Sequence, residues 1–423
     1  MKVTVRQLVI FALVIVFLTA FRAMRYYVGG RLQELGLLFA LILFVYSAVV
    51  VALNDKRPCL GWNKWFFVPL GLIVYAMILP GYLWATNTGA TILPSIMASR
   101  EFLIILICPA IYFLYRMGLP VSDIEKAIHI ALIFAVFSYI TLRLTLPLES
   151  WWVSSDPHLK SLVVWDSVRG YRLKMPGTAF FLALYVAPLQ IFRTTDPMMK
   201  AIWVATLSLA ILGLVLIQGR AMTASIVMGV MLYLFFFASR ARMALLVFAL
   251  PAIIVVMYGA IDFYFQQTEA LYRSGHGIRY VSYNIAFEQL NKFPLFGVGM
   301  NSKQSLSEQM LFGREFDSFD LGIVGIAFRY GLVGAVLHTV GALWVNARAI
   351  KGNWYYKDMH GYGNPIIIGL LAKVVTELVN YVLTSTYTTI PGLLMASMII
   401  ALSAIYKQEQ GKQLREPTSS LAA

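Results

Sequence analysis

Apolar blocks of about 20 residues recur along the whole chain and are separated by short polar segments. A helix needs about 20 apolar residues to cross the hydrocarbon core of a bilayer, so each block predicts one membrane-spanning helix. The pattern predicts about 12 spans. They lie near residues 4–23, 36–54, 65–84, 100–115, 128–146, 175–192, 201–218, 221–238, 243–262, 321–347, 363–384 and 390–406.

Composition agrees with an all-α, polytopic membrane protein. The chain is 60% hydrophobic and only 13% charged, whereas soluble proteins carry about 25% charged residues. We expect one transmembrane domain over residues 1–423, with a large loop at 262–320 between spans nine and ten and a disordered tail at 407–423. The first block is expected to be a retained span, because no small-residue cleavage site follows it.

Lysine and arginine are unevenly distributed over the polar segments. If the N-terminus is cytoplasmic, the segments near Lys56, Arg240 and Lys351 all fall on the cytoplasmic side. Because lysine and arginine favour that side, we expect both ends of the chain to be cytoplasmic. The 262–320 loop is then periplasmic.

Several charged residues fall on the periplasmic side in this orientation, where the same rule does not explain them. Arginine binds phosphate oxygens through two parallel hydrogen bonds, so arginines at the bilayer edge suit the pyrophosphate of a lipid-linked sugar. The candidate substrate-binding residues on this side are Arg169, Arg172, His276, Arg314 and Asp317. Of the two arginines in the 147–174 segment, the pattern slightly favours Arg172.

Several classes of chemistry have no visible machinery in the sequence. It contains no Walker A loop, no HExxH motif and no CxxC pair, and so we expect no ATP-driven or zinc-dependent reaction, no cofactor and no nucleic-acid partner. The cysteines, Cys59 and Cys108, are not expected to form a disulfide. Transfer from an activated lipid-linked donor needs only cations for the leaving group and a base for the acceptor hydroxyl.

Within the 262–320 loop, "RYVSYNIAFEQLNKFP" predicts an amphipathic helix that begins near Arg279 and stops at Pro294. The glycines of the following "FGVG", Gly297 and Gly299, predict a tight turn with unusual backbone angles. Helical spacing defines the apolar face of the helix. This face comprises Tyr283, Ala286, Phe287 and Leu290.

Three stretches of the chain resemble the superfamily of O-antigen ligases and Wzy-type O-antigen polymerases. "IQGRAMTASIVMG" contains Arg220 and is similar to the start of one of its spans, and "RYVSYNIAFEQLNKFPLFGVG" is similar to its external loop. "DLGIVGIAFRYGLVG", which begins at Asp320, is similar to the following span. More weakly, "VRGYRLKMPGTAFFLALYVAPL" resembles the entry to span six. The matches keep their order over roughly the C-terminal 60% of the chain.

The resemblance implies a metal-independent glycosyltransferase in the bacterial inner membrane, with an active site facing the periplasm. Its donor would be an undecaprenyl-pyrophosphate-linked glycan, and a chain-length regulator protein is a further partner that it allows. By position, Arg220 and Arg279 match the arginines that contact pyrophosphate. Asp320 and Leu321 stand where the ligases place a His-Asn pair. This departure favours a polymerase, with Asp320 as the general base.

Each candidate also has a purely structural interpretation. Arg220 has an alternative role as an anchor at a helix end, and Arg279 as a surface charge. Asp320 has an alternative role as the N-cap of span ten, in which case His276 is the next candidate base. Asp317 is more simply a capping or solvated neighbour.

Two further patterns are expected to be structural. Lys373 and Glu377 lie four residues apart in span eleven and predict a buried pair. Trp151, Trp152 and Trp165 predict an aromatic belt at the bilayer surface.

Two other functions compete with the polymerase. An O-antigen ligase would transfer the glycan to lipid A–core instead of to a lipid-linked repeat unit. A flippase or transporter of lipid-linked sugars would need charges along a central path, whereas the charges here gather on one side.

Overall fold

The structure is a computed structural model that describes residues 4–28, 34–54, 62–166, 170–217, 278–299, 318–380 and 389–414. Its helices are α1 (Val5–Ala20), α2 (Leu35–Asn54), α3 (Trp62–Ile73), α4 (Leu79–Thr88), α5 (Ile92–Ala98), α6 (Ile107–Arg116), α7 (Val121–Thr145), α8 (Leu148–Trp152), α9 (Pro157–Leu162), α10 (Gly177–Arg193), α11 (Pro197–Ile217), α14 (Ile278–Lys292), α16 (Gly322–His360), α17 (Pro365–Asn380) and α18 (Ile390–Gln413). Short helical turns are η1 (Met24–Tyr26), η3 (Val74–Ile78), η4 (Arg100–Leu106) and η5 (Ser318–Leu321), and the strands are β1 (Val163–Asp166) and β2 (Gly170–Leu173).

The described helices are those of a multi-pass membrane protein. Six are long and apolar enough to cross a bilayer, and α5 with the η4–α6 segment adds a seventh that is bent by 53°. The shorter helices α1 and α10 are also apolar. Every predicted span coincides with helix except 221–238 and 243–262, which lie outside the described residues. The number of 12 spans therefore stays a prediction.

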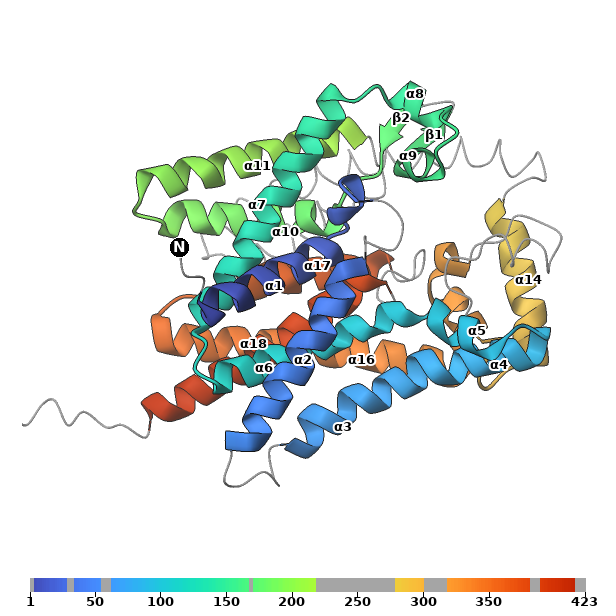
Figure 1. The fold of residues 1–423 in the computed structure, drawn as a ribbon, viewed down its shortest axis with the longest axis horizontal. Helices are drawn as coiled ribbons and strands as arrows, with labels where there is room; N and C mark the ends of the chain where they lie inside the picture. The colour runs from blue at the N-terminus through green and yellow to red at the C-terminus, as the bar shows by residue number, and fades with distance from the viewer. Residues whose placement is uncertain are drawn as a thin grey trace, which may run out of the picture.

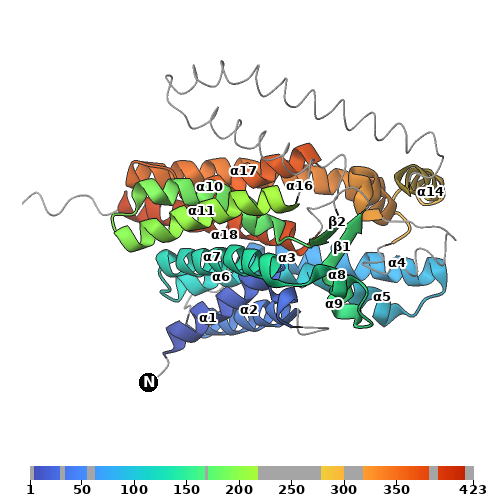
Figure 2. The ribbon, with the colours of Figure 1, turned by 90° about the horizontal axis from the view of Figure 1, so that it is seen from above.

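The two ends of the helical bundle differ in what they carry (Figures 1 and 2). At one end α1 begins and α18 finishes, and we call this end the terminal face. At the other end lie α5, α14 and the β1–β2 hairpin, and we call it the hairpin face. This arrangement agrees with the predicted alternation of the polar segments between two sides. The assignment of the hairpin face to the periplasm stays a prediction.

Apolar side chains hold the bundle together. Phe17, Phe180 and Leu402 are fully buried in one large core, in which α16 packs against α18, α10 against α11 and α17, and α1 against α2 and α7. Ion pairs fasten helix ends on both faces. Arg6 donates to Asp123 at 2.9 Å on the terminal face, and Arg100 donates to Glu34 at 2.7 Å on the hairpin face.

The fold is not entirely α, and the expectation of an all-α protein is wrong in this detail. Strands β1 and β2 form an antiparallel hairpin in which Val163 pairs with Leu173 and Asp166 with Gly170. Val163 and Leu173 are buried, and the hydroxyl of Tyr139 donates to the carbonyl oxygen of Leu173 at 3.3 Å. The 147–174 segment therefore folds onto the end of α7 instead of running as an open loop.

Helix α18 is longer than the predicted span 390–406 and continues to Gln413, so the first part of the tail predicted to be disordered, 407–423, is helical. Packing against other helices explains the extension. The hydroxyl of Tyr406 donates to Glu125 on α7 at 2.6 Å, and Lys412 donates to the hydroxyl of Tyr115 on α6 at 3.3 Å. Residues 415–423 lie outside the described residues.

Candidate functional site

Helix α14 confirms the predicted helix of the long loop. On the predicted apolar face, Ala286 is buried and Tyr283 is partly buried in the same small core, whereas Phe287 is 50% exposed. Ser282, which lies outside the predicted face, is also buried. Small side chains on the inner face allow α14 to pack closely against α16 and η5. The contact forms a second small core from Trp84, Ala286, Val298, Leu321 and Phe328.

The turn after α14 forms as predicted. The helix ends at Lys292, before Pro294, and Gly297 and Gly299 have φ angles of 71° and 99°. Neither position has room for a side chain. A Cβ atom on Gly297 would lie 2.5 Å from the carbonyl oxygen of Phe328, and one on Gly299 would lie 2.4 Å from the backbone nitrogen of Trp84. The turn is therefore held tightly between α4 and α16.

Helix α16 is broken where it meets this turn. Gly331 has φ 70° and ψ −175°, which interrupts the helix, so the predicted span 321–347 is not one straight helix. The backbone N–H of Val298 donates to Phe328 O at 2.9 Å, and the N–H of Leu332 donates to Pro294 O at 2.9 Å. The turn thus satisfies backbone groups that the break leaves open, which matters in a bilayer because unpaired groups are costly there. We call residues 293–299 and 328–333 the Gly331 joint.

The structure brings together the elements that carry two of the predicted catalytic residues. Arg279 is the second residue of α14 and Asp320 lies in η5, and α14 packs against both η5 and α16 on the hairpin face. The N-cap of α16 is Leu321, and no side chain caps this helix. Both interpretations of Asp320, as a base and as a cap at the start of span ten, stay predictions.

The other predicted site residues are divided between described and undescribed parts of the chain. Arg172 lies in β2 on the hairpin face. The remaining candidates lie outside the described residues, and their roles stay predictions. They are Arg169, Arg220, His276, Arg314 and Asp317.

The predicted pair in span eleven and the predicted aromatic belt concern packing and not the site. The Lys373 ammonium lies 3.9 Å from the ring centroid of Phe181, while the side chain of Glu377 is outside the described part. Trp165 is 48% exposed, and Trp151 and Trp152 pack partly buried against the main core. Of the three tryptophans predicted to form a belt, Trp165 is therefore the one that lies exposed on the surface.

Arg172 belongs to a group of basic residues at the ends of α1, α7 and β2. We call the group the cationic cluster, and its members are Arg22, Arg25, Arg143, Arg172 and Lys174. The hydroxyl of Tyr139 lies within electrostatic range of Arg25, Arg143 and Arg172. Arg25 Nη2 and the hydroxyl of Tyr26 both donate to the carbonyl oxygen of Lys174. These contacts tie η1 to the end of β2 and gather the cations.

Arg22, Arg25 and Arg143 do not stand out in the sequence. Each one lies in the last residues of a predicted span or just after it, where an arginine is commonly a membrane anchor. Their shared position on the hairpin face, on segments that follow α1 and end α7, is the signal that distinguishes them. The sequence alone does not show that these arginines form one cluster, because they come together only in the folded protein.

The cations of the cluster disfavour one another. The pKa of Arg22 is lowered by burial and by the charge of Arg25, and the carboxylate of Glu101 opposes this shift. The pKa of Lys174 is also lowered, first by its loss of hydration and then by the charges of Arg25 and Arg22. Arginine still stays charged at any physiological pH. A cluster of this kind favours the binding of an anion, which would relieve the repulsion.

Two charged residues near these elements, Arg329 and Glu101, are buried. Arg329, on α16, is fully buried, and its Nε donates to Gly325 O at 3.0 Å. Glu101, in η4, is 7% exposed and lies within electrostatic range of both Arg22 and Tyr330. Arg329 is not among the predicted site residues, although a single cation inside an apolar span is itself a signal of function.

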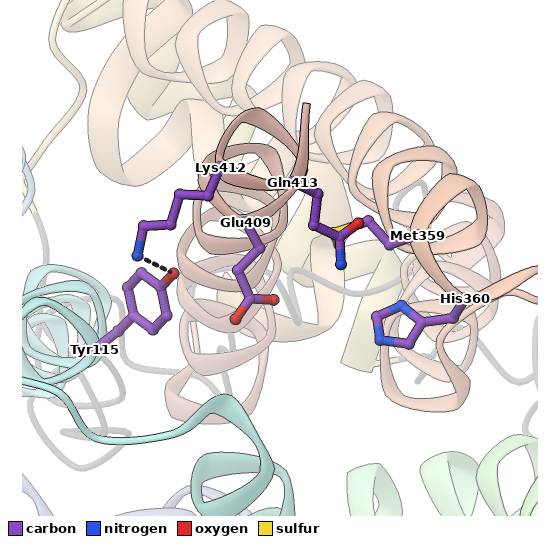
Figure 3. A pocket seen from close by; sticks show the side chains of 6 residues that line it. All are labelled: Tyr115, Met359, His360, Glu409, Lys412 and Gln413. Carbon is purple, nitrogen blue, oxygen red and sulfur yellow. Dashed lines mark hydrogen bonds between the residues drawn. The ribbon is translucent and has the colours of Figure 1, made fainter. Parts of the chain in front are cut away.

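A pocket of about 310 Å³ opens on the terminal face and is shown in Figure 3. Its lining includes His360, Glu409 and Lys412, and Lys412 donates to the hydroxyl of Tyr115. These residues come from the C-terminal ends of α6, α16 and α18, which lie at the end of the bundle opposite α14 and the β1–β2 hairpin (Figure 1). This pocket is therefore separate from the predicted site residues that the structure describes.

Comparison with known proteins identifies the family of one segment. Residues 205–339 match the family described as O-antigen ligase. The resemblance predicted from the sequence is confirmed for this segment. It contains Arg220, Arg279 and Asp320. A search of curated proteins finds no match. The family match supports a transferase function of the O-antigen ligase or polymerase type.

Proposed function

We propose that the protein is a polysaccharide polymerase of the bacterial inner membrane. It transfers an undecaprenyl-pyrophosphate-linked glycan to a lipid-linked repeat unit on the periplasmic side. The observation that carries the proposal is the packing of α14 against η5 and α16. This packing joins the elements of Arg279 and Asp320 at one end of the membrane helices, inside the segment that matches the O-antigen ligase family.

The proposed chemistry needs one base and a set of cations. Asp320 accepts the proton of the acceptor hydroxyl, whose oxygen attacks the anomeric carbon of the donor glycan. The bond between this carbon and the pyrophosphate oxygen breaks, and undecaprenyl pyrophosphate leaves with the bonding electrons. Arg279 and Arg220 stabilise the charge on this leaving group through bidentate hydrogen bonds. Among the described residues, no group of three or more His, Cys, Asp or Glu is placed to hold a metal ion.

The choice of acceptor rests on the residues at the start of span ten. Asp320 and Leu321 stand where the resembling ligases carry a His-Asn pair, which favours a lipid-linked repeat unit as the acceptor. A ligase is the second candidate function, because the matching family is described as O-antigen ligase. In that case the same donor chemistry delivers the glycan to lipid A–core.

The test is reconstitution with defined substrates. The purified protein in lipid nanodiscs receives synthetic undecaprenyl-pyrophosphate repeat units, and the products are separated on a gel. A polymerase yields a ladder of regular steps. A ligase yields product only when lipid A–core is added. Absence of product with both acceptors, from protein that unfolds cooperatively on heating, would contradict both functions and favour a transporter.

A further inference from the structure

Arg22 holds a backbone conformation that normally belongs to glycine. It follows α1 with φ 61° and is the one non-glycine residue with positive φ among the residues that the structure describes. The N–H of Ala23 donates to Leu18 O, and the N–H of Arg22 donates to Thr19 O, both at 2.9 Å. This pattern resembles a Schellman helix end, in which glycine usually takes the left-handed position because a Cβ atom is unfavourable there.

The charge of Arg22 adds a second cost to the strained backbone. Arg22 is partly buried, and its guanidinium lies within electrostatic range of Arg25 and of the carboxylate of Glu101. Glycine at this position would remove both the strain and the buried charge. Strained residues of this kind cluster at functional sites, where the side chain has a use that outweighs the cost. The Arg22 guanidinium is therefore expected to bind a ligand.

The surroundings of Arg22 offer hydrogen-bond donors for an anion. Nε of Arg25 and Nε of Arg143 are buried, and no described residue accepts a hydrogen bond from either atom. Buried donors nearly always have a partner in native proteins. Lys174 adds an exposed ammonium at the edge of the cluster, within electrostatic range of Arg22 and Arg25. A phosphate group provides the several acceptor oxygens that such donors require.

The cationic cluster also lies outside the segment that matches the O-antigen ligase family. Its members fall between residues 22 and 174, whereas Arg220, Arg279 and Asp320 fall within 205–339. The proposed polymerase binds two lipid-linked glycans at once, and each one carries its own phosphate groups at the membrane surface. One set of arginines cannot hold both.

We propose that the cationic cluster is a second anion site, which binds the phosphate groups of the acceptor lipid, and that Arg22 contacts them directly. This inference rests on the proposed function. The same phosphate chemistry is present on a lipid-linked repeat unit and on lipid A–core, so the experiment uses both.

The test separates donor from acceptor with two synthetic lipids. A repeat unit whose acceptor hydroxyl is methylated serves only as a donor. A repeat unit joined to its pyrophosphate through carbon instead of oxygen serves only as an acceptor. Transfer from the first to the second is measured at varied concentrations of each, for wild-type protein and for Arg22→Gly.

For Arg22→Gly we expect the KM for the acceptor lipid to rise at least about tenfold, which is a typical loss for a charged hydrogen bond. The KM for the donor lipid should stay within about twofold of wild type. The melting temperature should rise by about 2 °C or more, because glycine relieves the backbone strain. An unchanged acceptor KM, or a fall in melting temperature with equal losses for both lipids, would overturn the inference.

A matched control tests the strain argument by itself. Gly361 ends α16 with φ 77° on the terminal face, and a Cβ atom added to it would meet no other atom within 4 Å. Gly361→Arg places an arginine in the same conformation without an anion site. It should lower the melting temperature and leave both KM values unchanged.

Assays with the two acceptor lipids show which lipid supplies the phosphate. The activity of the wild-type protein shows whether the proposed function or only the second anion site fails. If only lipid A–core accepts glycan and Arg22→Gly raises its KM, the second anion site stands and the acceptor is lipid A–core. If wild-type protein transfers glycan to neither lipid, the proposed function fails and the inference fails with it. If wild-type protein transfers normally and Arg22→Gly matches it, only the inference fails.

Discussion

The backbone N–H of Leu332 donates a 2.9 Å hydrogen bond to the carbonyl oxygen of Pro294. The two residues belong to different sequence stretches, the external-loop turn and the membrane span that follows it. The bond exists because Gly331 breaks α16 and leaves this N–H without its partner in the preceding turn. The loop and the span thus complete one hydrogen-bonded unit.

Gly331→Ala should therefore destabilise the protein. A Cβ atom at this position would lie 2.0 Å from Leu295 O, in a left-handed conformation that alanine tolerates poorly. We expect a loss of about 1–3 kcal/mol in the free energy of unfolding, measured by thermal unfolding in detergent. Gly341→Ala is the control, because a Cβ atom on Gly341 in α16 would meet no other atom within 4 Å. Equal stability of the two variants would contradict the role of the joint.

Asp320→Asn tests the proposed base. Asparagine has nearly the same shape but cannot take up the proton of the acceptor hydroxyl. Since the N-cap of α16 is Leu321, we expect stability close to that of wild type. Turnover should fall by about 100- to 10,000-fold, measured as ladder formation from lipid-linked repeat units.

Asp317→Asn is the matched control for Asp320→Asn and should be much milder. Should Asp320→Asn turn over like wild type, the base lies elsewhere. His276→Gln is then the next variant to measure.

Arg220→Lys and Arg279→Lys test the predicted contact with the leaving pyrophosphate. Lysine keeps the charge but loses the two-pronged geometry, so we expect each variant to lose most polymer formation while staying folded in membranes. Arg193→Lys on the terminal face is the control. Arg193 donates to Gly363 O at 2.6 Å and lies over the ring of Tyr362, so this change should affect stability and not polymer formation. Near-normal polymer from both test variants would show that neither arginine holds the pyrophosphate.

Lys174 gives the proposed second anion site a pH dependence. Its pKa is lowered, by lost hydration first and then by the charges of Arg25 and Arg22. The free ammonium therefore loses its proton at a lower pH than an ordinary lysine, while an anion binds the protonated form. Affinity for inorganic pyrophosphate should fall as the pH rises through this lowered pKa, measured by calorimetry of the purified protein.

Lys174→Arg should not show this fall, because arginine stays charged over the same pH range. Titration of the pyrophosphate itself cancels in the ratio of the two affinities. A ratio that stays constant with pH would exclude Lys174 from the anion site.

The orientation in the membrane has a direct chemical test. In a background without reactive cysteines, Ser305→Cys should react with an impermeant maleimide added from outside, and Trp354→Cys should not. Residue 305 lies in the predicted periplasmic loop, and Trp354 is 60% exposed near the terminal-face end of α16. The reverse labelling pattern would place the candidate site on the cytoplasmic side.

The sequence predicts the helices of this protein well because bilayer thickness fixes their length and apolar character. Gly297, Gly299 and the end of α14 before Pro294 are also predictable, since glycine and proline act through local backbone geometry. The break at Gly331 is not predictable in the same way. The break depends on hydrogen bonds to residues 294–298, and the residues of span ten by themselves do not indicate these bonds.

The site was partly predictable for a similar reason. The resemblance of local stretches points to Arg279 by a match and to Asp320 by a departure from the pattern. The structure packs their elements, α14 and η5, against each other, and their roles stay predictions. The cationic cluster instead joins segments more than 100 residues apart, such as Arg25 and Lys174. The burial of Ser282 beside Ala286 is not predictable from hydropathy, because close packing of α14 selects small side chains.

The Gly331 joint also limits how this protein can be re-engineered. A chimaera that exchanges the external loop for that of another transferase must cut the chain somewhere between α14 and α16. A cut that separates residues 293–299 from residues 328–333 would leave backbone groups of Phe328 and Leu332 without partners inside the bilayer. Specificity can therefore be transplanted only as a module that runs from α14 through Gly334, with the turn and the broken helix taken from the same parent.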